Sequence, residues 1–265
     1  MKHDANAPVA VLDSGLGGLT VLLELIRLMP EENYIYYGDA ANAPYGEKSV
    51  EQVRALTLDR ADFLLDALSA KALVVACNTA TSAAIEQLRQ KYPDQPVIGI
   101  EPALKPAALS GAHPRVLVLA TPVTLRENKF QRLLKSYESK AEVLPLPCPG
   151  LVEMIEKGIL EGPDLEALLK SLLREALSPP PDALVLGCTH YPLVEKSIRK
   201  VIGGPVKIFQ GGPGTARETL RRLEACGLRR NGGKGSLELR SSDERGSWIP
   251  LVEKLFRSAM EQLSE

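Results

Sequence analysis

Two stretches of the chain share one pattern and decide the fold: ALVVACNTATSAAIEQLR at residues 72–89 and ALVLGCTHYPLVEKSIRK at residues 183–200. Each begins with an aliphatic run, continues with a cysteine and small polar residues, and ends in a stretch of helical composition. A short aliphatic run without polar alternation is typical of a strand buried on both faces of a parallel sheet. The repeated pattern therefore predicts two similar α/β halves, each with a cysteine at the carboxyl end of a strand.

Other aliphatic runs alternate with helical stretches along the rest of the chain. The clearest helical pattern covers residues 164–177, and a last helix is expected at 248–263, after a polar, glycine-rich region with one short strand near 237–239. This alternation predicts an α/β fold of mostly parallel sheets covered by helices. The further runs expected to be buried strands are residues 9–12, 34–37, 97–100, 116–120 and 143–146.

Composition excludes several classes of protein. The chain has 265 residues and a net charge of −1, with 45% hydrophobic and 25% charged residues, which is ordinary for a globular protein. The charge balance gives no reason to expect nucleic-acid binding, and no apolar run is long enough for a membrane span. The polar start, MKHDANAP, shows no secretory signal, so we expect a cytoplasmic protein with four reduced cysteines rather than disulfides.

Cys77 and Cys188 are the strongest candidates for chemistry. Ligands of open parallel sheets bind at the carboxyl ends of strands, where the N-terminus of the following helix stabilises negative charge. One thiol beside a histidine is typical of a nucleophile, and two thiols facing one substrate are typical of proton removal and return. Cys188 and His190 also have the spacing of half a zinc site, but the chain has only three histidines, which argues against a zinc site.

The first strand continues into DSGLGG at residues 13–18, whose glycines let backbone amides approach a ligand. The stretch lacks the third glycine of a dinucleotide motif and the lysine of a P-loop. It therefore indicates either a plain turn or a small carboxylate or phosphate site, with Asp13 and Ser14 directed into it. NAPYGEKS at residues 42–49 reads as a turn before a helix, and Thr121 is expected to line the same site from the end of the fifth strand.

These segments resemble a known family. DSGLGGLTV (13–21), PYG (44–46), ACNTAT (76–81), GIEP (99–102) and GCTHYP (187–192) are similar, in this order, to the signature segments of glutamate racemase. That enzyme is one of the cofactor-independent amino-acid racemases with two catalytic cysteines. The resemblance runs from about residue 9 to residue 218.

The resemblance implies a fold and a set of site residues. It implies two α/β domains related by a pseudo-twofold axis, with the active site in the cleft between them and no cofactor or metal. We expect residues 1–102 plus 208–265 to form the first domain and residues 103–207 the second. The implied catalytic residues are Cys77 and Cys188, assisted by Asp13, His190 and Glu156, and the implied substrate-binding residues are Asp13, Ser14, Tyr45, Gly46, Asn78, Thr79, Thr189 and His190.

The resemblance also implies a biological setting, and it leaves alternatives open. It implies a homodimer that acts on glutamate and supplies D-glutamate for peptidoglycan synthesis. Aspartate as the substrate, a role as a gyrase-inhibiting binding protein, and thiol hydrolysis are the competing hypotheses. One segment departs from the family: FQGGPG at residues 209–214 replaces a stretch that often contains Asp-Ser-Gly, so we assign it no role.

Overall fold

The computed structural model describes residues 4–244 and 246–264, with side chains through residue 257 in the last helix. Its contacts divide the chain into two compact units, residues 1–100 with 212–265 and residues 101–211. Each unit is an α/β layer structure with one parallel sheet, so the predicted fold class is confirmed.

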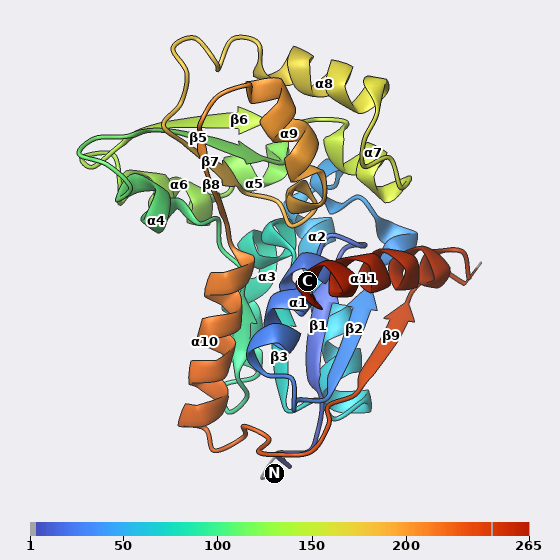
Figure 1. Ribbon diagram of the computed structural model, residues 1–265. Coiled ribbons are helices and arrows are strands. Elements are labelled where there is room, and N and C mark those ends of the chain that lie inside the picture. The colour runs from blue at the N-terminus through green and yellow to red at the C-terminus, as the bar shows by residue number, and fades with distance from the viewer. Residues whose placement is uncertain (1–3, 245, 265) are drawn as a thin grey trace. The chain divides into compact units, whose positions relative to one another are not determined.

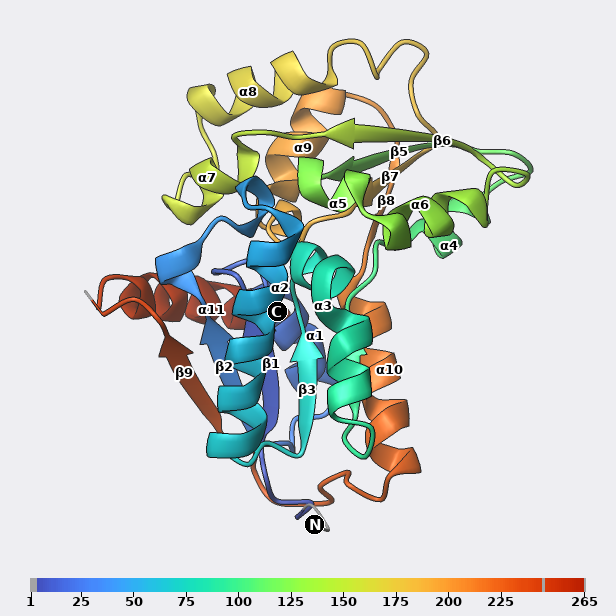
Figure 2. The same ribbon diagram turned by 180° about the vertical axis from the view of Figure 1, so that it is seen from behind.

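The first unit contains a five-stranded parallel sheet of order β4-β3-β1-β2-β9. Figure 1 shows α1 and α10 side by side on one face of this sheet, and Figure 2 shows α2 and α3 on the opposite face. The strands are β1 (Val9–Asp13), β2 (Tyr34–Gly38), β3 (Ala72–Val75), β4 (Val97–Gly99) and β9 (Leu237–Ser241). The helices are α1 (Leu19–Leu28), α2 (Val50–Asp62), α3 (Asn78–Lys91), α10 (Gly212–Ala225) and α11 (Trp248–Ser264), with short helical turns at Ala40–Asn42, Tyr45–Glu47 and Phe63–Ala67.

Side chains of the central strands alternate between two apolar layers. On one face, Leu12, Ile35 and Val75 join a buried cluster with residues of α2 and α3. On the other, the Tyr36 ring stacks on Trp248 of α11 with centroids 6.0 Å apart, and its hydroxyl donates to the Gly15 carbonyl. Both faces are therefore covered, as the continuous aliphatic runs predicted.

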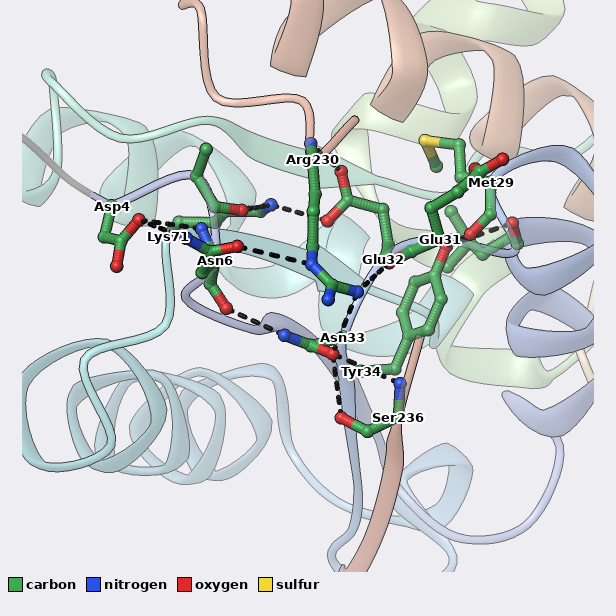
Figure 3. A network of polar contacts seen from close by, with 12 residues as sticks. Asp4, Asn6, Met29, Glu31, Glu32, Asn33, Tyr34, Lys71, Arg230 and Ser236 are labelled. Atoms are coloured by element: carbon green, nitrogen blue, oxygen red, sulfur yellow. Dashed lines mark hydrogen bonds and ion pairs between the residues drawn. The ribbon is translucent and has the colours of Figure 1, made fainter. Parts of the chain in front are cut away.

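Polar contacts join distant segments near the start of the first unit's strands (Figure 3). The Lys71 ammonium lies 2.5 Å from a carboxylate oxygen of Glu32, and neither side chain is exposed. The other Glu32 oxygen accepts from the Arg230 backbone amide at 2.8 Å, and the Arg230 guanidinium donates to the Glu31 carbonyl. A side chain at position 235 would place its Cβ 2.2 Å from the Glu32 carbonyl, so glycine is required there.

The second unit contains a four-stranded parallel sheet of order β6-β5-β7-β8. Figure 1 shows α8 and α9 on one face of this sheet, and Figure 2 shows α5 and α6 on the other. The strands are β5 (Arg115–Ala120), β6 (Glu142–Pro147), β7 (Ala183–Leu186) and β8 (Lys207–Gln210). The helices are α4 (Leu104–Ala108), α5 (Pro122–Arg126), α6 (Asn128–Lys135), α7 (Leu151–Glu156), α8 (Pro163–Leu173) and α9 (Glu195–Ile202), with a helical turn at Tyr191–Val194.

The structure differs from the sequence predictions at three elements of the second unit. Residues 143–146 were expected to be buried on both faces, but β6 is an edge strand and is only partly buried; two prolines fit there because an edge strand can lack ladder donors. The helix expected over 164–177 ends at Leu173. No strand was predicted at 207–210, yet β8 pairs with β7 across the boundary expected at residue 208.

Candidate active site

The carboxyl ends of neighbouring strands bring Asp13, Ser14 and Cys77 together in the first unit. β1 and β3 pair in parallel, so Asp13 at the end of β1 and Cys77 just beyond β3 lie on the same edge of the sheet. The Cys77 thiol lies 3.5 Å from the Ser14 hydroxyl, and the Gly15 amide donates to the Asp13 carboxylate at 3.0 Å. Only 5% of Cys77 and 1% of Asp13 are exposed, so both groups are largely shielded from water.

Cys77 also caps the helix that follows it. The Ala80 amide donates to the sulfur atom at 3.4 Å, at the N-terminus of α3, where unpaired amides and the helix dipole stabilise negative charge. Asn78 and Thr79 form the first turn of α3, and both are buried. The Asn78 side-chain nitrogen has no hydrogen-bond partner among the described residues, so it is a donor available to a ligand.

Tyr45 and Gly46 follow β2 in a short helical turn before α2. The Tyr45 hydroxyl donates to the Asp39 carboxylate at 2.7 Å. Burial raises the pKa of Tyr45, and the negative charge of Asp39 and its hydrogen bond raise it further, so the hydroxyl stays protonated. Ser49 and Gln52 form a capping box that begins α2 and thereby ends the turn.

Gly18 lets α1 begin close to Asp13. A Cβ atom at this position would lie 2.7 Å from the Asp13 Cβ and 3.0 Å from the Ala76 Cβ, and all these atoms belong to short, inflexible side chains. The glycine-rich stretch therefore serves close packing at the strand end as well as the turn itself.

In the second unit, Cys188, His190 and Glu156 form a chain of polar contacts. The Cys188 sulfur lies 3.6 Å from His190 Nδ1, and His190 Nε2 lies 2.5 Å from a carboxylate oxygen of Glu156. Cys188 follows β7 after one residue, Gly187, and Glu156 ends α7. The histidine is thus held between a thiol and a carboxylate, an arrangement in which the carboxylate orients the ring.

The surroundings of His190 favour its charged form. Burial by itself lowers the pKa of His190, but the hydrogen bonds and charges of Cys188 and Glu156 outweigh this effect and raise the pKa well above its usual value. In this charged form the ring is an imidazolium, which can donate to both partners. Such a group can supply a proton to the sulfur or stabilise a negative charge on it.

Other residues near Cys188 complete the strand-end cluster of the second unit. Thr121 caps α5 at the end of β5, and its hydroxyl lies 2.9 Å from that of Thr124. Thr189 is buried beside Cys188. Burial raises the pKa of Cys148 to about 12, with a further contribution from Cys188, so Cys148 stays a neutral thiol.

The predicted site residues thus fall into two groups, one in each unit. The first group is Asp13, Ser14, Tyr45, Gly46, Asn78 and Thr79 around Cys77, and the second is Thr121, Glu156, Thr189 and His190 around Cys188. All four cysteines are free thiols. Among the described residues, no cluster of three histidine, cysteine or acidic side chains is arranged to hold a metal ion.

Sequence reasoning missed two residues in these groups. Asp39 lies one residue beyond β2 and supports Tyr45. Its signal was an aspartate close after the run at 34–37, a context similar to that of Asp13 after the run at 9–12. Tyr191 is fully buried, and its pKa is raised by burial and then by the two neighbouring cysteines, Cys148 and Cys188. Tyr191 lies inside the GCTHYP segment, and the sequence alone does not show that its side chain is buried beside the two cysteines.

Comparison with known proteins shows where the chain has relatives. Residues 20–219 match the model of the Asp/Glu/Hydantoin racemase family. A glutamate racemase from Clostridium perfringens is 49% identical over 255 residues, which cover 94% of this chain and 96% of the relative.

Solved structures give the same result. A glutamate racemase isoform from Bacillus anthracis has a TM-score of 0.85 with 33% identity, covering 96% of this chain and 94% of that one. A glutamate racemase from Francisella tularensis, solved in complex with D-glutamate, has a TM-score of 0.84 with 30% identity and the same coverage. The resemblance seen in the signature segments is therefore confirmed. No helix among the described residues is long and apolar enough to cross a membrane.

Proposed function

Because this chain belongs to the Asp/Glu/Hydantoin racemase family, we propose that it interconverts L- and D-glutamate by proton transfer between two thiols and the α-carbon. One observation carries the proposal: each unit holds a thiol two residues beyond a buried parallel strand, with polar partners at hydrogen-bonding distance. Cys77 has the Ser14 hydroxyl, and Cys188 has the His190 ring supported by Glu156.

The proposed reaction consumes nothing. A thiolate on one face of the substrate removes the α-proton, so that a C–H bond breaks and an S–H bond forms. The thiol on the other face delivers its proton to the carbanion-like carbon, and the configuration inverts. The roles of Cys77 and Cys188 exchange in the reverse direction, with Asp13 assisting the first thiol and the His190–Glu156 pair assisting the second. The chemistry requires that both sulfur atoms reach one α-carbon, and it needs no cofactor.

The remaining residues have binding roles in this proposal. Asn78 offers its unpaired side-chain nitrogen to the substrate, and Ser14, Thr79, Thr121 and Thr189 offer hydroxyls or backbone amides at strand ends. The Tyr45–Gly46 turn supplies a further backbone contact. Support for glutamate as the substrate comes from the relatives that carry this name and from the Francisella tularensis structure that holds D-glutamate.

The same proposal includes a cellular role. A cytoplasmic homodimer would supply D-glutamate for peptidoglycan synthesis. Rescue of a bacterial D-glutamate auxotroph by this chain tests the supply, and size-exclusion chromatography with light scattering tests the homodimer.

The decisive assay is chiral chromatography of purified protein with L- or D-glutamate in deuterated water, with no cofactor added. We expect each enantiomer to give its mirror image with deuterium at the α-carbon, because a different thiol delivers the new proton. We expect Cys77→Ala and Cys188→Ala each to abolish racemisation while the protein stays folded. Cys226→Ala is the matched control, because this cysteine is exposed and belongs to neither group.

Four outcomes would contradict the proposal. Wild-type activity in Cys77→Ala or Cys188→Ala contradicts the two-base mechanism. Product that keeps its original α-hydrogen contradicts it as well. If aspartate is racemised faster than glutamate, aspartate and not glutamate is the substrate. A burst of product from an activated ester without any racemisation indicates thiol hydrolysis instead.

A further inference from the structure

Asp39 is a buried carboxylate to which the proposed chemistry assigns no role. It lies one residue beyond β2, and none of its surface is exposed. Its carboxylate accepts hydrogen bonds from the Tyr45 hydroxyl at 2.7 Å and from the Asn42 side chain at 3.1 Å. Arg60 Nε lies 3.4 Å from its other oxygen. A buried charge is costly unless it is paired, and here three partners from two segments surround it.

The backbone of Asp39 connects this carboxylate to the end of the first strand. The Asp39 amide donates to the Asp13 carbonyl at 2.9 Å, which continues the pairing of β1 and β2. The Asn42 amide donates back to the Asp39 carbonyl at 2.9 Å. Asp39 is therefore bonded on one side to the strand end that carries Asp13 and on the other to the turn that carries Tyr45.

Tyr45 links this network to the thiol. Only 3% of the tyrosine is exposed, and it belongs to the same buried cluster as Cys77. Burial raises its pKa most, and the charges of Asp39 and then Cys77 raise it further. The hydroxyl stays protonated and so continues to donate to Asp39. The position of the turn thus depends on a charge-assisted hydrogen bond, the strong kind in proteins.

We propose that Asp39 is a positioning residue for the racemase reaction: through Tyr45 it holds the Tyr45–Gly46 turn where its backbone meets the amino-acid substrate, in register with Asp13 and Cys77. Arg60 places a positive charge beside this buried carboxylate, which offsets the cost of burying it. The inference rests on the proposed function, because the substrate is the one named there. It predicts a role in binding the substrate, separate from proton transfer.

Two variants test the hydrogen bond from either side. Asp39→Asn removes the charge but keeps an acceptor, and Tyr45→Phe removes the donor. We expect each to raise KM for glutamate about tenfold, the loss expected for one charge-assisted hydrogen bond, while kcat changes less than about threefold. Because both act on one contact, the double variant should have a KM close to that of the worse single variant.

The chain offers a matched control on the same helix as Arg60. Asp62 accepts from the Tyr92 hydroxyl at 2.7 Å, the same distance as in the Asp39–Tyr45 pair, and this pair is more exposed. Asp62→Asn and Tyr92→Phe should leave KM unchanged. If Asp39→Asn does not fold, Tyr45→Phe and its control still decide the question.

The outcomes separate this inference from the proposed function. Calorimetry with D-glutamate on the same variants gives the binding constant independently of turnover. A wild-type chain that racemises glutamate, with unchanged KM in Asp39→Asn and Tyr45→Phe, overturns only the role of Asp39. A fall in kcat alone, or additive effects in the double variant, also overturns it. A wild-type chain that neither racemises nor binds glutamate overturns both proposals.

Discussion

Replacing Lys71 by methionine would leave the Glu32 carboxylate buried without its cation. The two charged groups lie 2.5 Å apart, and neither side chain has any exposed surface. Removal of one member of a buried ion pair costs about 3–5 kcal/mol, because the remaining charge stays desolvated and uncompensated. Since domains are stable by only about 5–15 kcal/mol, we expect Lys71→Met to lose a large part of the free energy of unfolding.

Urea unfolding followed by circular dichroism measures this loss, and hydrogen exchange shows where it acts. We expect faster exchange in β9, because Glu32 also accepts from the Arg230 amide in the segment that leads into this strand. The double variant Glu32→Gln/Lys71→Met should recover to within about 1 kcal/mol of wild type, because it removes both charges and keeps an acceptor for Arg230. Lys91→Met is the control, since its pair with Asp62 is exposed and contributes roughly 0–1 kcal/mol.

A Lys71→Met variant that loses less than about 1 kcal/mol would contradict this role of the buried ion pair. A double variant as unstable as the single one would contradict it too, because the loss would then come from packing of the lysine stem and not from the unpaired carboxylate.

Two further predictions follow from the strand ends. Gly38→Ala places a Cβ 2.2 Å from the Trp248 ring and 2.8 Å from the Gly15 carbonyl, so thermal unfolding should show a loss of about 1–3 kcal/mol, and an unchanged melting temperature would contradict this close approach. Glu156→Gln removes an anion beside His190, so the pKa of the imidazole, measured by nitrogen NMR, should fall. In the wild type the folded-state pKa of His190 is raised above the unfolded value of 6.5. The stability that His190 contributes is therefore fully present below pH 6.5 and is lost as the pH rises through the folded-state pKa. A histidine pKa that is equal in both proteins would sink the second prediction.

Local sequence identified most of the strands because burial on both faces leaves a readable pattern. The runs at 9–12, 72–76 and 183–186 are uninterrupted aliphatic segments, and each is a central strand in the structure. β8 was not predicted because it is an edge strand whose sequence, KIFQ, mixes polar and apolar residues and does not resemble a core segment. β6 was wrongly expected to be buried on both faces for the same reason, since the aliphatic composition of residues 143–146 does not show that this strand lies at the edge of the sheet.

The sequence by itself determined the α/β class and the two cysteines, because a strand–cysteine–helix pattern is a local property of the chain. Only the tertiary structure decided which polar groups meet each thiol: Ser14 reaches Cys77 from 63 residues away, and Glu156 reaches His190 from 34. The contacts that make Asp39 important were decided there as well, because they come from buried partners in other segments. Pairing of buried charges depends on which strand ends become neighbours in a sheet, and that order is a property of the folded chain.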